Sequence, residues 1–216
     1  MMESKTKTMT RVAMLSALAF AAVLFIRIPM VLFLEYDPKN VIITIGGFIW
    51  GPFMSLMVAV VTAFIEFLTI SEDGIIGLVM NIISICAFSC TAAFIYKKDR
   101  TLRGSIIGLV SGTILLTVVM VLWNYLVTPI YMGIPRAEVV KLLVPAIMPF
   151  NLIKGGIDSA IILLIYKPIV SALRRTVLKS EAKDAPKMIV HPGVMAVAVL
   201  VIVTCVMLVL AMKGII

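Results

Sequence analysis

Three polar side chains stand at helical spacing inside one of the most apolar stretches of the chain. Asn151, Lys154 and Asp158 are separated by three and four residues within residues 147–166. On an α-helix these spacings place side chains on one face. An amide both donates and accepts hydrogen bonds, whereas a lysine donates and an ionised aspartate accepts. Such a face suits a neutral heterocycle in which carbonyls and N–H groups alternate.

The composition sets the surroundings of these side chains. Hydrophobic residues make up 62% of the 216 residues and charged residues only 14%, against about 25% charged residues in soluble domains. An ionisable group in a membrane helix is costly, so it normally faces a cavity, a pathway or a partner. Two interpretations stay open: Lys154 and Asp158 form an ion pair that packs helices together, or their face lines a binding site.

Membrane spans follow from runs of about 20 apolar residues, the length that crosses a hydrocarbon layer roughly 30 Å thick. Five such runs are clear, at residues 12–33, 76–96, 104–127, 147–166 and 193–212. The region 40–70 exceeds one span and contains Gly46-Gly47 and Gly51-Pro52. We expect a short helix there, a tight turn, and a second helix over residues 53–70.

The predicted fold class is therefore an all-α integral membrane protein with seven helices. Residues 1–175 form a six-helix unit, residues 176–192 a basic cytoplasmic linker, and residues 193–216 an additional C-terminal transmembrane helix. This last helix is rich in Val, Leu, Met and Ala. Such a composition is typical of an accessory helix that faces lipid.

The positive charges predict how these helices are oriented. With the N-terminus in the cytoplasm, most of the 19 lysines and arginines fall in cytoplasmic connections, as the positive-inside rule requires. This topology predicts a multi-pass protein of the cell membrane with its C-terminus outside. The net charge of +8 then reflects topology and lipid headgroup contact, and the shortness of the basic loops argues against nucleic-acid binding.

Further polar side chains lie on other predicted spans, mostly near their external ends. They are Thr62, Glu66, Asn81, Ser84 and Asn124. With Asn151, they place amides on three helices near one membrane face, which favours a binding site. The alternative is that the amides hydrogen-bond neighbouring helices and serve packing alone.

Two external loops are longer than a simple connection needs. Residues 27–40 contain Leu34, Tyr36 and Asp37, and residues 128–141 contain Tyr131. A tyrosine on a semi-rigid loop can cover a flat ligand while its hydroxyl stays in water. Each tyrosine can equally be an aromatic anchor at the membrane interface.

Enzymatic and metal chemistry find little support in the sequence. The residues that normally carry them, such as paired histidines, an acidic cluster or a nucleophile beside a base, are missing from the predicted spans. The single histidine, His191, lies near the start of the last span. Three cysteines are expected to be small apolar fillers: Cys86, Cys90 and Cys205. We expect neither an enzyme nor a bound metal or cofactor.

Several short motifs together resemble a known family of membrane proteins. They are Leu34-Glu35-Tyr36-Asp37-Pro38-Lys39-Asn40-Val41, Gly46-Gly47-Phe48, Gly51-Pro52, Gly74-Ile75-Ile76-Gly77-Leu78-Val79-Met80-Asn81, Asn124-Tyr125, Pro129-Ile130-Tyr131 and Pro149-Phe150-Asn151-Leu152-Ile153-Lys154-Gly155. The set resembles the riboflavin-specific substrate-binding (S) component of energy-coupling-factor (ECF) vitamin importers. The resemblance covers residues 8–175, and its most specific part is the last motif with the Asn-Tyr pair upstream.

The resemblance implies a fold, a ligand and a set of binding residues. It implies a six-helix unit with an externally facing riboflavin pocket beneath the first loop. Hydrogen bonds to the flavin are then expected from Asn124, Asn151 and Lys154, with Asn81 as a further candidate. Side chains from the two loops complete the candidate substrate-binding set: Leu34, Tyr36, Asp37 and Tyr131. The ligand would be transported rather than held as a cofactor.

The sequence departs from the family pattern at three places. Asn40 stands where many relatives have an acid, and Asp158 adds a charge one turn after Lys154. The seventh span exceeds the six that the family implies. The first departure bears on closure of the loop, the second on the polar edge of the ligand, and the third on the side of the membrane that holds the C-terminus.

A ridge of small residues on the first span suggests a contact with another helix. Ala13, Ala17 and Ala21 recur every four residues, a spacing that allows close helix approach, within one protein or between two. The resemblance implies that this ridge docks on a transmembrane coupling subunit driven by two cytosolic ATPases. The chain has no Gly-x-x-x-x-Gly-Lys-Ser/Thr phosphate loop of its own.

Other transport functions stay open from the sequence alone. Sister S components bind other vitamins or small compounds on the same fold, so the fold does not name the ligand. A stand-alone secondary carrier is a further alternative, since Glu66, Lys154 and Asp158 can form a proton relay. The internal repeat common in such carriers is not visible in the sequence.

Overall fold

The structure is a computed structural model that describes residues 5–31, 34–71, 74–176, 192–213 and 215, with backbone alone over 167–176. Within these ranges, six helices are long and apolar enough to cross a membrane: Lys5–Phe25, Pro52–Thr69, Gly74–Lys98, Leu102–Met132, Arg136–Tyr166 and Pro192–Met212. The shorter apolar helix Lys39–Trp50 joins them. The predicted all-α class with a short second helix is thus confirmed.

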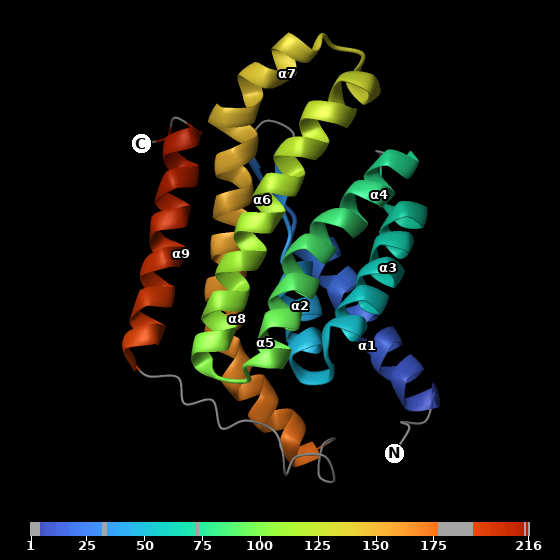
Figure 1. Cartoon of the computed structure of the whole chain (residues 1–216), viewed down its shortest axis with the longest axis vertical. Coiled ribbons are helices and arrows are strands. Elements are labelled where there is room, and N and C mark those ends of the chain that lie inside the picture. Colours follow the sequence, from blue (N-terminus) through green and yellow to red (C-terminus); the bar gives the residue numbers. More distant parts are fainter. Residues whose placement is uncertain (1–4, 32–33, 72–73, 177–191, 214, 216) are drawn as a thin grey trace.

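In chain order, the elements are α1 (Lys5–Phe25), β1 (Ile28–Val31), β2 (Leu34–Tyr36), α2 (Lys39–Trp50), α3 (Pro52–Thr69), α4 (Gly74–Ile85), the π-helical turn η1 (Cys86–Cys90), α5 (Thr91–Lys98), α6 (Leu102–Met132), α7 (Arg136–Leu142), the π-helical turn η2 (Leu143–Ile147), α8 (Met148–Thr176) and α9 (Pro192–Met212). Figure 1 shows α7 at one end of the bundle and the turn between α5 and α6 at the other. We call these the α7 end and the α5–α6 end.

The predicted tight turn between the second and third helices forms at Gly51-Pro52. Gly51 has a φ of 100°, a conformation that residues with a Cβ rarely adopt. Pro52 is the first residue of α3, where its missing N–H costs nothing because that group would have no partner within the helix. The two residues therefore reverse the chain without breaking either helix.

The predicted end of the first span is wrong. We expected that helix to continue to residue 33, but α1 ends at Phe25 and an antiparallel hairpin of β1 and β2 follows. Pro29 explains the difference, because proline lacks a backbone N–H and disfavours helical backbone in the residue before it. An ion pair between Arg27 and Glu35 joins the two sides of the hairpin.

The predicted second external loop is also largely helical. Helix α6 continues through Pro129 to Met132, and α7 begins at Arg136 after a short connection. Gly133 ends α6 with a φ of 63°, the left-handed conformation that commonly terminates helices. Tyr131 therefore lies on the last turn of α6 and not on a loop.

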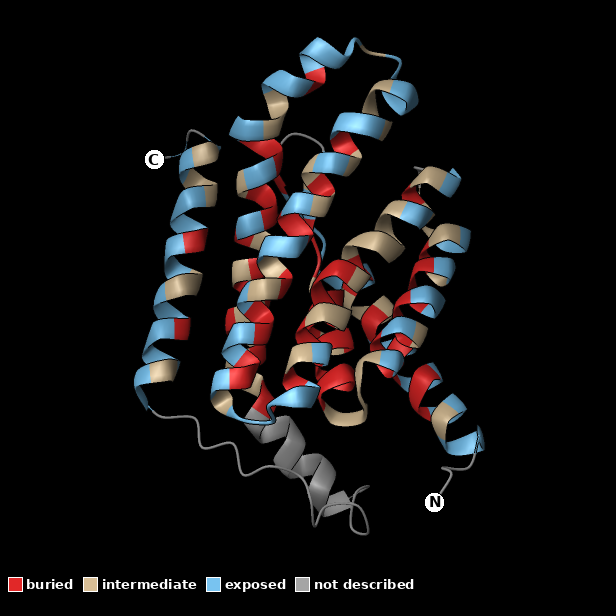
Figure 2. Ribbon diagram, in the orientation of Figure 1, coloured by how far each residue is buried: buried red, intermediate tan, exposed pale blue. Residues whose placement is uncertain are grey.

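Close packing between helices is concentrated toward the α5–α6 end. A Cβ added at Gly108 would lie 2.8 Å from the Ala92 carbonyl oxygen, and one at Gly112 would lie 2.7 Å from that of Phe88. These glycines let α6 approach η1 and α5 backbone to backbone, as small residues do in membrane helices. In Figure 2 the buried residues face the interior of the bundle, whereas exposed residues follow the outer faces.

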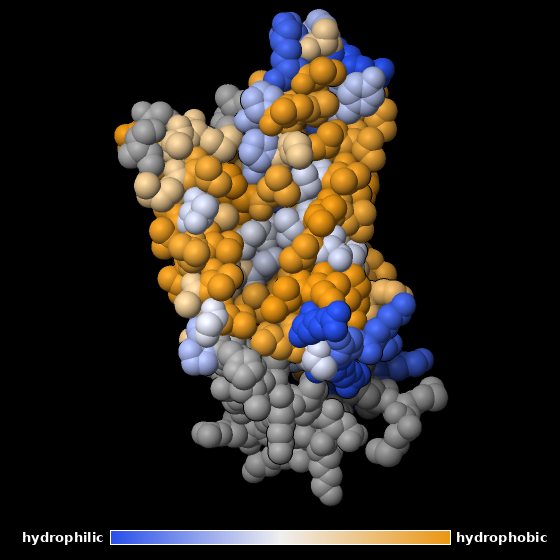
Figure 3. Space-filling model, turned by 60° about the vertical axis from the view of Figure 1, so that its left-hand side comes forward, coloured by the Kyte–Doolittle hydropathy of each residue, from blue (hydrophilic) through white to orange (hydrophobic). Residues whose placement is uncertain are grey.

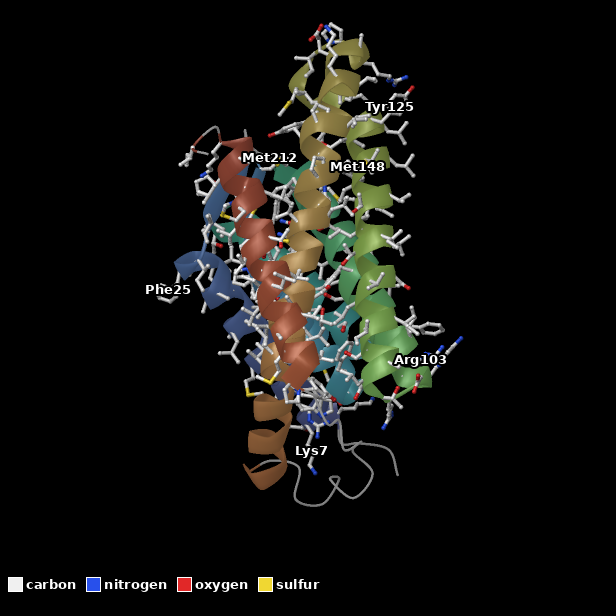
Figure 4. All side chains as sticks on the ribbon, turned by 90° about the vertical axis from the view of Figure 1, so that its left-hand side faces the viewer. Lys7, Phe25, Arg103, Tyr125, Met148 and Met212 are labelled. Atoms are coloured by element: carbon white, nitrogen blue, oxygen red, sulfur yellow. The ribbon has the colours of Figure 1, made fainter. Side chains whose placement is uncertain are left out.

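Helix α9 packs along the outer side of α8, as Figures 1 and 4 both show. A Cβ added at Gly156 of α8 would lie 3.3 Å from the Cys205 sulfur of α9. Cys205 also joins a buried apolar cluster with Met30 and Tyr36 of the hairpin. The appended helix thus contacts the bundle through one narrow stripe and exposes most of its remaining surface.

The surface has the pattern expected of a membrane protein. On the face that Figure 3 shows, hydrophobic residues cover most of the middle of the molecule and hydrophilic residues gather toward its two ends. Figure 4 shows Lys7 and Arg103 at the α5–α6 end, with Tyr125, Met148 and Met212 toward the opposite end. Of the predicted linker 176–192, residues 177–191 lie outside the described part of the chain.

Candidate functional site

A cavity of about 330 Å³ lies between the hairpin and helices α3, α4, α6 and α8. Its volume falls within the ~300–1,000 Å³ typical of small-molecule sites. The cavity occupies the half of the bundle nearer α7, where α4 and α6 diverge (Figure 1). Its apolar walls include Met80, Met120, Trp123 and Phe150. Apolar walls of this kind suit an aromatic ligand, and the polar groups among them would fix its orientation.

Lys154 lines this cavity from α8 and is paired with Asp37, the residue that directly follows the hairpin. Its ammonium nitrogen lies 2.8 Å from Asp37 Oδ2. Asp158, one turn further along α8, instead accepts hydrogen bonds from the Tyr36 hydroxyl at 3.0 Å and from Asn40 Nδ2 at 3.1 Å. Lys154 therefore pairs with Asp37 and not with Asp158, the partner that the ion-pair interpretation gave it. Helix α8 thus makes polar contacts with Tyr36 at the end of the hairpin, with Asp37 directly after it and with Asn40 of α2.

The Asp37 carboxylate lies between two ammonium groups. Its Oδ2 atom is 2.8 Å from Lys154 Nζ and 3.7 Å from Lys39 Nζ. Burial alone would raise the pKa of Asp37, but the two lysines outweigh burial and lower that pKa to about 2. Asp37 is thus ionised at neutral pH, and its charge makes the two buried lysines tolerable.

A second ion pair joins α2 to α3. Lys39 Nζ lies 2.7 Å from Glu66 Oε2 and 3.3 Å from Asn81 Oδ1 of α4. Asn81 Nδ2 in turn lies 3.4 Å from Glu66 Oε2. Lys39 and Glu66 are both at least nine-tenths buried. Neutralisation by a close opposite charge is what allows ionised groups to persist at such depth.

The two candidate asparagines on α6 and α8 are held in the same way. Asn124 Nδ2 donates to the Met120 carbonyl oxygen at 2.8 Å, and Asn151 Nδ2 donates to that of Ile147 at 2.8 Å. The Asn124 oxygen accepts from the Thr128 hydroxyl at 2.9 Å. These bonds within each helix fix the amides where they line the cavity. Polar groups held in place before binding lose little freedom when a ligand arrives.

The structure brings together all the predicted substrate-binding residues except Tyr36. The cavity is lined by Leu34, Asp37, Asn81, Asn124, Tyr131, Asn151 and Lys154. Tyr36 points instead into the contact with α8, with its hydroxyl on Asp158. Burial and the Asp158 charge raise the Tyr36 pKa, so the phenol stays protonated and donates. The expectation that this hydroxyl stays in water above a ligand is therefore wrong.

Two charged residues that line the cavity, Lys39 and Glu66, were not predicted as binding residues from the sequence. Lys39 is the first residue of α2, whereas the sequence predicts it in the external loop of residues 27–40. Glu66 was noted only as a polar residue within a span. A signal was present, because Lys39 begins an apolar helix in which a lysine needs a nearby acid. The long separation along the chain between residues 39 and 66 hid the pairing.

A second hollow of about 560 Å³ lies on the outer face between α1 and α3. It is lined by Thr8, Met9, Val12, Ala13, Leu56, Met57, Val60 and Val61. Ala13 and Ala17 are exposed and Ala21 is half-buried. Among the described residues, no group of three or more His, Cys, Asp or Glu side chains is placed to hold a metal ion.

Comparison with known proteins decides the family. Residues 7–166 match the family model described as "ECF transporter, substrate-specific component". The chain belongs to this family. As an S component, it is a multi-pass membrane protein that works in transport, and the match includes every helix that lines the cavity.

Individual relatives agree with this assignment. This chain is 32% identical over 180 residues to "Riboflavin transporter RibU" of Staphylococcus aureus (strain TCH60), covering 79% of this chain and 94% of the relative. It is 31% identical over 182 residues to a protein of the same name from Streptococcus thermophilus (strain ATCC BAA-250 / LMG 18311), covering 79% of this chain and 86% of the relative.

A solved structure shares the fold. The structure titled "Structure and mechanism of the S component of a bacterial ECF transporter" superposes with a TM-score of 0.68 at 30% sequence identity. The superposition covers 80% of this chain and all of the other. Helix α9 begins at Pro192, beyond the last residue that the family model matches.

Proposed function

We propose that this S component captures riboflavin in the cavity between the hairpin and helices α3, α4, α6 and α8. The relatives named above are riboflavin transporters, and "Riboflavin transporter FmnP" of Bacillus subtilis (strain 168) is 29% identical over 175 residues, covering 75% of this chain and 91% of the relative. The observation that carries the proposal is the convergence of Asn124, Asn151 and Lys154 on one apolar cavity.

The chemistry of the cavity supports a flavin. An isoalloxazine ring is flat and apolar on its faces, which suits the walls formed by Met120 and Trp123. One edge of the ring carries alternating carbonyl and N–H groups. Asn124 and Asn151 offer both donors and acceptors to such an edge, and Lys154 offers donors only. The ligand stays neutral, so the existing ion pairs need no new counter-charge.

The charge distribution supports an external opening. Basic residues such as Lys97 and Arg103 gather at the α5–α6 end, opposite the cavity. By the positive-inside rule this end lies in the cytoplasm, together with the start of α1. The α7 end and the end of α9 then lie outside. Capture would occur from outside, with the six-helix unit of residues 1–175 binding the ligand and the helix at 193–216 as an addition.

Delivery across the membrane requires partners. We propose that the groove between α1 and α3, with the ridge of Ala13, Ala17 and Ala21, docks on the transmembrane coupling subunit of an ECF importer. Two cytosolic ATPases would drive that subunit. The exposed alanines support the docking, because small side chains let a partner helix approach closely. The loaded S component would then release riboflavin inward.

A titration tests the proposed ligand. Full-length protein purified in detergent is titrated with riboflavin while flavin fluorescence is followed, and quenching is expected at submicromolar concentrations. Asn151→Ala should weaken binding about ten- to hundredfold, because loss of a polar partner in a dry site costs ~1–3 kcal/mol. A folded protein without quenching at micromolar riboflavin would reject riboflavin as the ligand. Uptake into liposomes without ATPases would favour the stand-alone carrier.

A further inference from the structure

Glu66 lines the cavity and has one carboxylate oxygen without a hydrogen-bond donor among the described residues. Its side chain is 4% exposed, and its Oε2 atom is engaged by Lys39 and Asn81. The other oxygen, Oε1, has no hydrogen-bond partner among the described residues. Buried carboxylate oxygens are almost always hydrogen-bonded, since leaving one without a donor is costly. A bound molecule that reaches this oxygen can supply the missing donor.

The chemistry of that missing donor is restricted. An ionised carboxylate only accepts hydrogen bonds, so the ligand group next to Oε1 must carry an O–H or N–H. A cationic ligand is disfavoured, because Lys39 Nζ already lies 2.7 Å from the same carboxylate. An anionic ligand is disfavoured by the carboxylate itself. A neutral donor such as a hydroxyl fits best.

Neighbouring groups on α4 extend the same polar wall. Asn81 and Ser84 both line the cavity, and the Ser84 hydroxyl donates to the Asn81 carbonyl oxygen at 3.0 Å. Carboxylate, amide and hydroxyl groups that line one wall can bind the hydroxyls of a polyol, because each hydroxyl both donates and accepts. This wall belongs to α3 and α4, whereas Asn124 and Lys154 lie on α6 and α8.

Riboflavin has two polar parts that these two walls can divide between them. The ring edge needs donors for its carbonyls and an acceptor for the N–H between them, and Lys154 and the asparagines of α6 and α8 together supply both. Its ribityl chain carries hydroxyls, which Glu66 can accept. We propose that Glu66, assisted by Asn81, forms a second subsite that binds the ribityl hydroxyls. This inference rests on the proposed riboflavin function and adds the position of the polyol chain.

Two ligands that differ only in the polyol separate the subsite from the rest of the cavity. Riboflavin and lumiflavin share the same ring, but lumiflavin carries a methyl group in place of the ribityl chain. The test variant is Lys39→Met/Glu66→Met, which removes both members of the ion pair and leaves no unpaired charge. The matched control is Lys141→Met/Glu138→Met, which removes the exposed Lys–Glu pair of α7.

Wild-type protein should bind riboflavin more tightly than lumiflavin. In Lys39→Met/Glu66→Met, riboflavin affinity should fall about ten- to hundredfold, the range for a lost hydrogen bond to a charged group, while lumiflavin affinity stays within about twofold. The control should leave both affinities unchanged. Glu66→Gln keeps the shape of the side chain and should give a smaller loss confined to riboflavin.

The outcomes distinguish this inference from the proposed function. If wild-type protein binds neither flavin, the riboflavin function is rejected together with the subsite. If it binds riboflavin but both Glu66 variants lose riboflavin and lumiflavin equally, or lose neither, the riboflavin function stands and the polyol subsite is wrong. Thermal unfolding in detergent, recorded for each variant, identifies any variant that fails to fold. Glu66→Gln then decides if the double variant does not fold.

Discussion

The two halves of the bundle are built from the same kind of apolar helix but differ in how their interiors are filled. Toward the α5–α6 end, the interior is filled by aromatic rings: Phe48 stacks on Tyr96 with ring centroids 4.3 Å apart, and Tyr166 meets both edge-on. Toward the α7 end, the interior is hollow and lined by ion pairs and amides. The half toward the α5–α6 end is filled by its own side chains, whereas the half toward the α7 end contains a cavity for a ligand.

Small residues account for much of this difference. Gly108 and Gly112 draw α6 against α5 and η1, so that half closes. Above them α6 carries Leu116, Met120 and Trp123, which line the cavity. Helices held tightly at one end and separated by larger side chains at the other diverge into a cleft. The cavity thus depends on the packing of the closed half as well as on its own walls.

The largest difference between the two halves is expected at Lys154. Lys154→Met removes a proposed hydrogen-bond donor to the flavin. It also leaves Asp37 without its closest partner, and loss of one member of a buried ion pair costs about 3–5 kcal/mol of folding stability. We expect riboflavin affinity to fall at least about hundredfold in a fluorescence titration. Tyr166→Phe removes one hydroxyl from the closed half, where it lies 2.9 Å from that of Tyr96, and should leave affinity unchanged. Equal losses in both variants would contradict the division between the halves.

Packing of the closed half should control stability. Gly112→Ala places a Cβ 2.7 Å from a backbone oxygen, and overpacking of this kind costs about 1–3 kcal/mol. The expected result is a Tm in detergent lower by roughly 2–10 °C. Gly193→Ala is the control, because nothing lies within 4 Å of a Cβ at that position of α9. A similar Tm for both variants would show that the close approach of α6 is unimportant.

The hydrogen bond between Asn40 and Asp158 should stabilise the half that contains the cavity. Asn40→Asp alone places two carboxylates about 3.1 Å apart, judged by the present contact, and like charges at this distance destabilise each other. We expect Tm to fall by about 4 °C or more. Asn40→Asp/Asp158→Asn restores one acid and one amide and should recover most of the loss. Additive losses would mean that the two side chains do not interact.

Helix α9 should contribute least. Cys205→Phe enlarges a buried side chain that packs beside the hairpin, whereas Val206→Phe enlarges an exposed one on the same helix. Partial displacement of α9 should loosen the hairpin and raise the riboflavin dissociation rate about twofold to threefold, since such changes act mainly on dissociation. Stopped-flow fluorescence measures this rate. Equal rates for the two variants would leave α9 without a role in ligand retention.

The sequence predicted the helices well because a membrane span has a simple signature. Length and hydropathy identified the seven helices, and the Gly51-Pro52 turn lay where the residues required it. The hairpin was missed because an apolar run before and after Pro29 has no helix–strand signal of its own. The helical continuation of α6 past Pro129 was also missed. The proline suggested a loop, but one proline near the end of a helix does not always terminate it.

The candidate site was predictable in part. Polar residues inside apolar spans indicated Asn124, Asn151 and Lys154, and all three line the cavity. The pairing of those residues was not predictable. Spacing within one helix suggested Lys154 with Asp158, but the partner of Lys154 is Asp37, 117 residues away in sequence. Tertiary contacts between distant segments decide which charges meet, and local periodicity carries no information on them.

Riboflavin binding in the cavity near α7 can be seen in a structure of the full-length protein determined with riboflavin. We expect the flavin ring between Met120 and Trp123, with its carbonyl edge within hydrogen-bond distance of Asn124, Asn151 or Lys154. The closed half should retain its stacked Phe48 and Tyr96. Riboflavin bound elsewhere, or in this cavity without contact to any of the three polar side chains, would show that the proposed binding site is wrong.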